Sequence, residues 1–464
     1  MKNSKLSIIN CQLSIISVLI CAVVSSLSVS AQEFEDAYTA VENMKIGWCL
    51  GNTLESNSGD TTNMWIEHWS SRRPSDYETS WGQPVTKASL MKLFKDAGFN
   101  TIRIPVTWYP HMEAKFTFDS NNVWWPSKDN LGTKVNATWM KRVHEVVDYV
   151  ISQGMYCILN VHHDTGAANT AWLVADEQVY EQQHERFESL WKQIAEEFKD
   201  YDEHLLFEGY NEMLDSYDSW CFASFATPSK YDSKVATSAY NAINSYAQSF
   251  VDAVRSTGGN NAQRNLIVNT YGGCDGNGTW NSHLKDPLKY MELPDDDVEE
   301  HIIFEIHTYL DIINLSTAQS TFKNVVSSAK TNLFKKGAPV IIGEWGTTTE
   351  NAYEKYHDNF LSYARFVVET LKANNMAGIY WMTLSDGTSR SKPEFTYPDL
   401  VDAIVKGYYG EGGYTGIDTP SLASHHKVSS VQEFKDAMYN LAGERVSADY
   451  KGIIIKNGRK YLVH

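Results

Sequence analysis

The chain has 464 residues, which is enough for two or three average domains or for one large barrel. Its formal net charge is −17 at pH 7. An acidic protein repels phosphate groups, so nucleic acid and anionic membrane surfaces are excluded as preferred partners. Aromatic residues make up 12% of the chain, and their flat faces suit sugar rings as well as an ordinary core.

Residues 1–31 have the pattern of a secretory signal peptide. Lys2 and Lys5 supply the positive start, residues 13–24 are mostly apolar, and Val29-Ser30-Ala31 fits a cleavage site of small residues. The apolar run is too short for a spanning helix, and no later run reaches about 18 apolar residues, so no transmembrane segment is predicted. We therefore expect a secreted, periplasmic or cell-surface protein.

The cysteines do not form a disulfide framework. Two of the six fall in the signal segment, and a lipoprotein anchored through Cys21 is an alternative that the bulky residue before it disfavours. Cys49 and Cys157 lie in apolar runs and are interpreted as buried small hydrophobes. Cys221 and Cys274 lie in predicted loops and could pair, because export permits disulfides.

Short apolar runs recur along the chain with the length of buried strands. Strands that alternate with single amphipathic helices pair in parallel through right-handed crossovers. Eight such units favour an α/β fold of the closed (β/α)8 type, a TIM barrel, over an open doubly wound sheet. No glycine-rich phosphate fingerprint follows the first strand. The predicted strands are residues 46–50, 101–105, 156–161, 205–209, 266–269, 302–306, 339–343 and 378–382.

Helical patterns fill the segments between most of these strands. Thr86 and Thr138 are the predicted caps of the first two helices, which should end before Gly98 and Gly154. Residues 398–409 are predicted to form the helix that closes the barrel. Two tryptophans on helix faces, Trp139 and Trp191, are assigned to packing.

Long connections follow several of the strands and hold many of the aromatic residues. Loops after the strands of such a barrel surround its catalytic face. Trp81 follows the first strand and Trp108 the second. Aromatic residues in these loops could line a cleft or pack the loops, and both interpretations stay open for Trp65, Trp69, Trp124 and Trp125.

The barrel is assigned to residues 35–410, and a different composition follows it. Residues 411–448 are interpreted as a linker with a short helical segment. Residues 449–464 alternate, and Asn457-Gly458 predicts a short C-terminal β-hairpin tail. A two-stranded tail cannot bury a core alone. It is therefore expected to dock on another surface or to act as a recognition tag.

Polar side chains gather where the predicted strands end. Strands four and seven lie opposite one another in such a barrel, so Glu212 and Glu344 should face each other over its mouth. Two facing carboxylates, one protonated and one ionised, are what glycoside hydrolysis requires. Arg103 and Tyr309 could hold one of them ionised, and Asn211 offers an amide to a sugar hydroxyl. The same rim holds His162, His163, His307 and Trp381.

The motifs around both carboxylates resemble those of a known family. Residues 341–346 (Ile-Ile-Gly-Glu-Trp-Gly) and 207–212 (Phe-Glu-Gly-Tyr-Asn-Glu) look like the two catalytic motifs of glycoside hydrolase family 5, the cellulase-type barrels of clan A. The resemblance covers about residues 35–410. Residues 101–108, 160–164, 307–309 and 380–381 are also similar, and residues 51–55 and 79–84 resemble the endoglucanase and xyloglucanase branch, subfamily 4.

This resemblance implies a retaining endo-β-1,4-glucanase that needs no metal or cofactor and acts on a β-glucan polysaccharide or oligosaccharide, as a monomer. Glu344 would be the nucleophile and Glu212 the general acid/base, with carboxyl groups about 5 to 5.5 Å apart. Arg103 and Tyr309 would hold Glu344. Asn211 and His162 would contact the cleaved sugar, His307 would lie near Glu212, and Trp381 would be the platform under the ring. Further substrate contacts are expected from Asn52, Trp81, Trp108 and His163.

Other polar residues near the rim have different interpretations. Glu208 and Glu305 share the strand parity of the rim residues, and we expect buried structural carboxylates. A metal cluster at His162-His163-Asp164 is disfavoured because adjacent strand residues point to opposite faces. Residues 382–386 depart from the loop of many relatives, so no sugar contacts beyond Trp381 are carried over.

Other functions remain as alternatives. A carbohydrate-binding barrel without activity would lack Glu212 or Glu344, and both are present. A Schiff-base enzyme needs a lysine at a strand end, and none of the predicted strands ends in one. Mannan or xylan cleavage by the same catalytic set is the alternative to β-glucan hydrolysis.

Overall fold

The computed structural model divides the chain into two units, Met1–Gly416 and Ile417–His464. It describes residues 33–57, 66–67, 70–112, 131–168, 170–218, 231–277 and 286–416, and the backbone of four strands in the second unit. The predicted signal peptide lies outside the described residues, as do Cys221 and the four tryptophans of uncertain role, Trp65, Trp69, Trp124 and Trp125.

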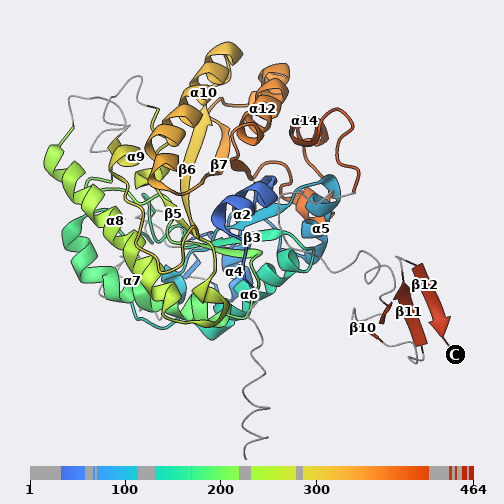
Figure 1. Ribbon diagram of the computed structural model, residues 1–464, viewed down its shortest axis with the longest axis horizontal. Coiled ribbons are helices and arrows are strands. Elements are labelled where there is room, and N and C mark those ends of the chain that lie inside the picture. Colours follow the sequence, from blue (N-terminus) through green and yellow to red (C-terminus); the bar gives the residue numbers. More distant parts are fainter. Residues whose placement is uncertain are drawn as a thin grey trace, which may run out of the picture. The chain divides into compact units, whose positions relative to one another are not determined.

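The first unit is a closed barrel of parallel strands in the order β1 to β8, so the predicted TIM barrel is confirmed (Figure 1). Most strands match their predictions to within a residue, but β6 and β7 run four residues further, so His307, Tyr309 and Glu344 lie inside strands. The strands are β1 (Ile46–Cys49), β2 (Thr101–Ile104), β3 (Tyr156–Asn160), β4 (Leu205–Glu208), β5 (Leu266–Asn269), β6 (Ile302–Leu310), β7 (Val340–Thr347) and β8 (Ala377–Trp381).

Amphipathic helices surround the barrel. The long ones are α5 (Ala88–Ala97), α6 (Ala137–Ile151), α7 (Glu177–Glu197), α8 (Ser233–Arg255), α10 (Leu315–Asn332), α12 (His357–Lys372) and α14 (Pro398–Tyr409). Shorter ones are α2 (Ala37–Met44), α4 (Pro74–Glu78), α9 (Asp286–Tyr290), α11 (Ala352–Lys355) and α13 (Thr388–Ser391). Among the described residues, none of the helices is long and apolar enough to cross a membrane.

Both predicted helix caps were wrong by one or two residues. The cap of α6 is Asn136, whose side chain accepts the N–H of Thr138 at 2.8 Å. Lys87 precedes α5, and the N–H of Thr86 donates instead to the buried carboxylate of Glu78 at 2.7 Å. Asn is as good a cap as Thr, so local sequence did not separate the candidates.

Helix α2 closes the amino-terminal end of the barrel. It runs directly into β1, and its buried residues pack against side chains that project into the barrel from the lower halves of the strands. The other face of each strand packs outward against the helices, which gives the two-sided burial of a parallel sheet. The inner cluster includes Ala37, Ala40, Val41 and Met44 of α2, with Cys49, Ile158, Leu206, Ile267, Ile303, Ile341 and Ile379 of the strands.

The second unit is an antiparallel sheet in the order β10-β9-β11-β12. Strands β11 (Gly452–Lys456) and β12 (Arg459–Val463) pair as the predicted hairpin, although its turn lies outside the described residues. The prediction of a two-stranded tail was wrong, because β9 (Met438–Asn440) pairs with β11, and β10 (Arg445–Val446) pairs with β9. These strands fall in the stretch assigned to the linker. Its predicted helical segment is not among the described residues.

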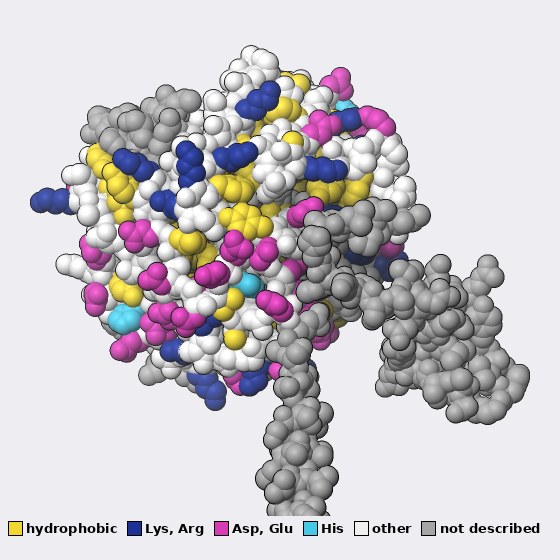
Figure 2. All heavy atoms as spheres, viewed as in Figure 1, with side chains coloured by type: hydrophobic (Ala, Val, Ile, Leu, Met, Phe, Trp, Pro, Cys, Tyr) yellow, Lys and Arg dark blue, Asp and Glu magenta, His cyan; other side chains and the backbone are white. Residues whose placement is uncertain are grey.

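Acidic and basic side chains gather on different parts of the face of the first unit shown in Figure 2. Most of the Lys and Arg side chains on this face lie in the upper half of the view, and most of the Asp and Glu side chains lie in the lower half.

Candidate active site

The guanidinium of Arg103 is the centre of the charged layer inside the barrel. Its Nε and Nη2 atoms donate to the two oxygens of Glu208 at 2.6 Å each, and both residues are completely buried. Its Nη1 donates to Glu344 Oε1 at 2.7 Å, and Nη2 also donates to Asn211 Oδ1 at 2.8 Å. One cation on β2 thus joins side chains carried by β4 and β7.

A β-bulge places Glu344. In the β6–β7 ladder Ile306 pairs with Ile342 but His307 pairs with Glu344, so Gly343 has no partner opposite it. A bulge turns the following side chain away from its regular direction. The second oxygen of Glu344 accepts the hydroxyl of Tyr309 at 2.7 Å.

The surroundings of Glu344 favour its ionised form. Burial raises the pKa of this carboxyl, but the charges of His307 and Arg103 and the hydrogen bond from Tyr309 outweigh burial and lower the pKa below its ordinary value. A low pKa keeps Glu344 a carboxylate that is able to act as a nucleophile near neutral pH.

Glu212 has the opposite electrostatic character. It lies just beyond β4, and its side chain is 20% exposed, so it faces the mouth of the barrel. Its Oε1 is 2.7 Å from Nδ1 of His307. Burial and the negative charge of Glu344 raise the pKa of Glu212, although His307 acts in the other direction. The two carboxyls therefore differ in the way that an acid and a nucleophile must differ.

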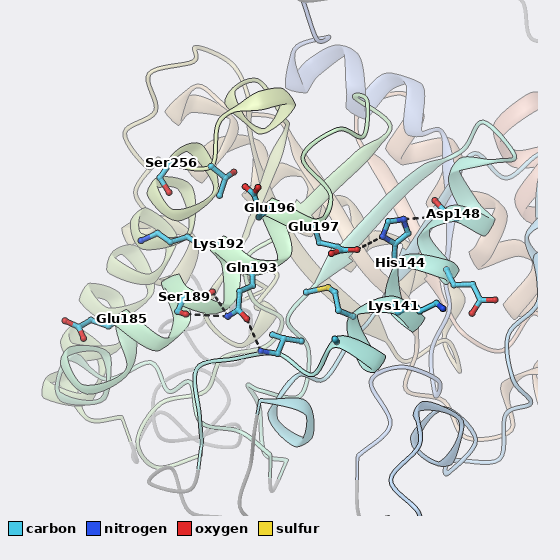
Figure 3. Close-up of a pocket in the computed structure, with 15 residues that line it drawn as sticks. Lys141, His144, Asp148, Glu185, Ser189, Lys192, Gln193, Glu196, Glu197 and Ser256 are labelled. Carbon is cyan, nitrogen blue, oxygen red and sulfur yellow. Dashed lines mark hydrogen bonds and ion pairs between the residues drawn. The ribbon is translucent and has the colours of Figure 1, made fainter. Parts of the chain in front are cut away.

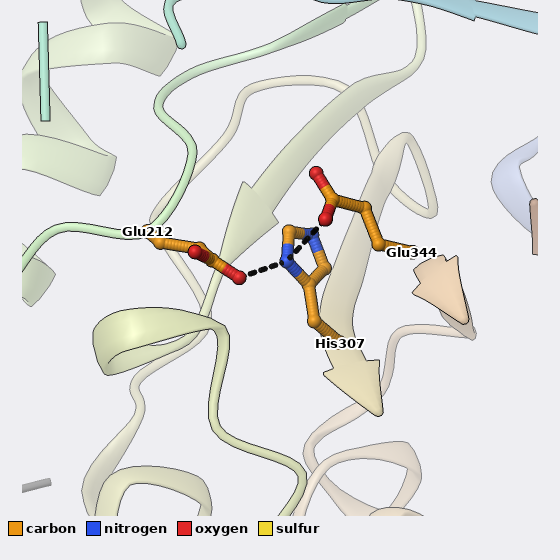
Figure 4. A group of neighbouring side chains, drawn as sticks. All are labelled: Glu212, His307 and Glu344. Atoms are coloured by element: carbon orange, nitrogen blue, oxygen red, sulfur yellow. Dashed lines mark hydrogen bonds and ion pairs between the residues drawn. The ribbon is translucent and has the colours of Figure 1, made fainter. Parts of the chain in front are cut away.

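His307 lies between the two carboxylates (Figure 4). Its Nδ1 is 2.7 Å from Glu212 and 3.6 Å from Glu344 Oε2. Burial by itself lowers the pKa of the imidazole, but Glu344, Glu212 and Glu305 reverse this effect and raise the pKa well above its usual value. The contacts of His307 with these carboxyl groups therefore favour its protonated form.

Glu212, His307 and Glu344 also bring three ligand-type atoms within 4.8 Å of one another. These residue types can hold a metal ion, but each of the three is already hydrogen-bonded within the site. At this separation, one oxygen of Glu212 and one of Glu344 can act on the two atoms of the same glycosidic bond.

An aromatic wall borders the carboxylates. The ring of His162 is parallel to that of Trp381, with centroids 5.9 Å apart and an angle of 6° between the planes. His163 lies 4.5 Å from His162 and 5.5 Å from Trp81, centroid to centroid. Trp81, His163 and Trp381 are each partly exposed. These three rings provide flat faces beside the charged centre, and His162 is buried between His163 and Trp381.

Comparison with known proteins identifies the family and the fold. Residues 64–387 match the family model "Cellulase (glycosyl hydrolase family 5)". The chain belongs to glycoside hydrolase family 5. It is therefore a glycoside hydrolase, and the predicted family and enzyme class are confirmed.

The similarity to relatives in family 5 covers most of the chain. The chain is 31% identical to "Endoglucanase B" of Neocallimastix patriciarum over 79% of its own length and 71% of that protein. It resembles the structure of a subfamily 4 broad-specificity endoglucanase from an uncultured bacterium, at 47% identity and a TM-score of 0.73, covering 83% of this chain and 98% of that one. It also resembles PbGH5A from Prevotella bryantii, a glycoside hydrolase family 5 enzyme, at 37% identity and a TM-score of 0.67, covering 82% and 100% of the two chains.

Two of the expected substrate contacts have other roles in this family 5 barrel. Trp108 is completely buried, and its indole N–H donates to the carbonyl of Asn160 at 2.9 Å, so the prediction that it contacts substrate was wrong. Asn52 adopts a positive φ of 61°, and its backbone N–H donates to Glu55. That hydrogen bond shapes the turn after β1, and no contact of the Asn52 side chain supports its predicted sugar-binding role.

The two adjacent histidines do not point to opposite faces as we expected. Strand β3 ends at Asn160, so His162 and His163 lie in the turn beyond it, where strand alternation no longer applies. Asp164 is not available to an ion, because its oxygens accept the indole N–H of Trp172 and the backbone N–H of Trp108, each at 2.7 Å.

Sequence reasoning missed three polar residues that support the site. Asn160 donates to Glu208 at 3.0 Å, and Asn269 Nδ2 lies 3.3 Å from His307 Nε2. Asn269 ends the predicted fifth strand and Asn160 lies one residue before the end of the predicted third strand, so a polar residue near a strand end was an available signal. Arg390 is buried and donates to the carbonyls of Ser385 and Gly51 at 2.6 and 2.8 Å, which ties the loop after β8 to the loop after β1. Nothing in its local sequence distinguishes it.

The cysteines are only partly tested. Cys49 is buried beside Arg103, and its Sγ lies 3.4 Å from the carbonyl of Gly343, while Cys157 is buried in the outer core. Burial raises the pKa of both thiols, which makes them poor nucleophiles. The pairing of Cys221 with Cys274 stays a prediction.

A separate groove lies outside the barrel (Figure 3). Its walls come from α6 and α7, with Ser256 and Thr257 at one end, and neither Glu212 nor Glu344 lines it. His144 in this groove is 2.7 Å from Glu197. The groove is lined by mixed charges on outer helix faces and does not belong to the active site.

Proposed function

We propose that this family 5 hydrolase is a retaining endo-β-1,4-glucanase that cleaves internal bonds of β-glucans by double displacement. The main support is that an oxygen of Glu212 and an oxygen of Glu344 lie within 4.8 Å of each other. Retaining enzymes hold their carboxyl groups about 5–5.5 Å apart, whereas inverting enzymes need about 6.5–9.5 Å to admit a water molecule.

In the first step Glu344 attacks the anomeric carbon while Glu212 protonates the departing glycosidic oxygen. Arg103 and Tyr309 each bind one oxygen of Glu344, which holds the carboxylate in place and favours its ionised form. In the second step Glu212, now a carboxylate, takes a proton from water, and the water releases the sugar from Glu344.

Asn211 is suited to bind the 2-hydroxyl of the cleaved sugar. Arg103 donates to its Oδ1, so the amide NH₂ group remains as a donor toward the substrate. Trp381 is partly exposed and supplies a flat face for the sugar ring, and Trp81 with His163 extends this surface along the rim.

Xyloglucan and mixed-linkage glucan are the proposed preferred substrates. A similar structure is described as a broad-specificity endoglucanase. PbGH5A was solved with a xyloglucan tetradecasaccharide, and another similar enzyme is described as a xyloglucan-specific endo-β-1,4-glucanase. We further propose that the enzyme is a secreted monomer whose signal peptide is removed after Ala31.

The test is a hydrolysis panel on carboxymethyl cellulose, xyloglucan, mixed-linkage glucan, mannan and xylan. We expect the viscosity of the β-glucans to fall much faster than reducing ends appear, because internal bonds are cut first. Proton NMR of the earliest product should show the β-anomer. An α-anomer would contradict retention, preference for mannan or xylan would contradict the substrate, and no release from any polymer would contradict the activity.

A further inference from the structure

A second buried carboxylate, Glu305, contacts His307 from the side opposite to Glu212. Glu305 precedes His307 by two residues on β6, so both side chains project into the barrel. His307 Nε2 is 3.1 Å from Glu305 Oε1, while Nδ1 is 2.7 Å from Glu212 Oε1. The imidazole thus bridges two carboxyl groups.

The barrel provides space for Glu305 at the β-bulge of β7. A Cβ atom on Gly343 would lie only 1.4 Å from Glu305 Oε1, so any side chain at that position would displace the carboxylate. Gly343 is also the residue that the ladder leaves unpaired, directly before Glu344. The same bulge therefore aims Glu344 and holds Glu305 against His307.

Glu305 makes its shorter contact with His307, at 3.1 Å, and its longer one with Arg103, at 3.6 Å. Arg103 gives its short hydrogen bonds to Glu208, Glu344 and Asn211, and its Nε is 3.6 Å from Glu305. The other oxygen of Glu305 is buried without a hydrogen-bond partner. The short hydrogen bonds thus form two chains, Glu208–Arg103–Glu344 and Glu305–His307–Glu212, which are joined only by longer contacts of 3.6 Å.

We propose that Glu305 is a positioning residue that keeps His307 protonated on both ring nitrogens and, through it, assists proton donation by Glu212. An ionised carboxylate only accepts hydrogen bonds, so Nε2 must carry a proton toward an ionised Glu305. Nδ1 carries the second proton when it donates to Glu212 Oε1, and not when it accepts the acid proton of Glu212. The competing arrangement has Nε2 accepting from Asn269, 3.3 Å away, with His307 neutral. This inference rests on the proposed roles of Glu212 and Glu344.

The expected effect is confined to proton donation. When Glu212 gives its proton to the leaving oxygen it becomes negative, and a cationic His307 at 2.7 Å stabilises that charge. A leaving group that departs without a proton does not need this help. Loss of the Glu305 charge should therefore matter only for substrates with poor leaving groups.

The kinetic test compares Glu305→Gln with wild type on aryl β-cellobiosides. For 4-nitrophenyl β-cellobioside and for β-glucan we expect kcat/KM to fall about 10- to 100-fold, within the range of general-acid effects. For 2,4-dinitrophenyl β-cellobioside we expect a change of less than about 2-fold by the same reasoning. Equal losses on all of them would show a merely structural role and overturn the proposal.

Glu208→Gln is the matched control. Glu208 is equally buried but bonds to Arg103 and Asn160 and has no contact with His307. Its loss should act through Arg103 on the nucleophile and lower kcat/KM by similar factors for good and poor leaving groups. If Glu208→Gln showed the same dependence on the leaving group as Glu305→Gln, the idea that the two chains of contacts act separately would be contradicted.

A second measurement is independent of activity. In protein labelled with ¹⁵N-histidine, the wild-type spectrum at pH 7 should show both ring nitrogens of His307 protonated, and Glu305→Gln should lower its pKa. An unprotonated nitrogen in the wild-type spectrum would overturn the proposal, even if the variant failed to fold. If wild type hydrolyses no β-glucan, the proposed function fails, while this spectrum still decides the state of His307.

Discussion

The two ends of the barrel interior are built from the same strands but have opposite chemistry. At the amino-terminal end Ile303 and Leu206 pack against α2 in a purely apolar cluster. Two residues further along the same strands are Glu305 and Glu208, which belong to the charged layer around Arg103. On these strands, one inward-pointing residue is therefore apolar and the next inward-pointing residue is charged.

This difference suggests that the apolar end serves mainly stability and the charged end mainly function. Apolar burial favours folding, whereas buried charges cost free energy unless each is paired and hydrogen-bonded. At the charged end Arg103 and His307 face Glu208, Glu305 and Glu344, so nearly every charge has a partner. We expect substitutions at the charged end to change turnover, and substitutions at the apolar end to change the free energy of unfolding.

The largest effect should come from Glu344→Gln. This substitution removes the nucleophile with little change of shape, and we expect kcat to fall by a factor on the order of 10⁵ to 10⁶, as for other nucleophile knockouts. The fold should persist, because Arg103 keeps its two bonds to Glu208. The measurements are kcat on β-glucan and calorimetric binding of a cello-oligosaccharide, which should remain. Turnover above about a hundredth of wild type would remove Glu344 as nucleophile.

At the apolar end, Met44→Ala should destabilise the protein without impairing the enzyme. Met44 is completely buried at the end of α2, so the cavity should cost about 2–5 kcal/mol in the free energy of unfolding. Denaturant unfolding measures this cost, and kcat/KM at low temperature should stay within about 2-fold because the effect is on stability alone. The control is Tyr38→Ala on the same helix, where an exposed side chain should change stability by less than about 0.5 kcal/mol. A large loss of kcat/KM in Met44→Ala would show that the two ends are coupled.

The two ends also differ in what the sequence predicts about them. The barrel follows from the alternation of apolar runs and helical patterns, and Glu212 and Glu344 follow from polar residues at strand ends. The bulge at Gly343 was not predicted, because the extra residue appears only when β6 and β7 are paired. The aromatic signal alone could not separate Trp108, which is core, from Trp81, which is partly exposed at the rim. Which face a loop side chain takes depends on contacts far away in the chain, such as that between Trp108 and Asn160.

The smallest effect, and the sharpest test of the charged end, is the pH dependence of kcat/KM. Glu344 must be ionised, and its pKa lies below the ordinary value, so activity should be lost on the acid side only below about pH 4.3. Glu212 must be protonated for the first step. Its raised pKa keeps it protonated above that pH, so activity falls only further to the alkaline side. The profile should therefore be bell-shaped, with apparent pKa values that belong to the coupled pair.

The alkaline limb can be assigned with a change of substrate. On 2,4-dinitrophenyl β-cellobioside the first step needs no proton from Glu212, so the alkaline limb of kcat/KM should weaken or move to higher pH, while the acid limb should stay in place. If both limbs are unchanged, the alkaline limb does not report Glu212. If the acid limb lies well above pH 4.3, then Arg103, Tyr309 and His307 do not hold Glu344 ionised as their contacts indicate. In that case the charged layer would serve to support the barrel rather than to separate the two carboxyl pKa values.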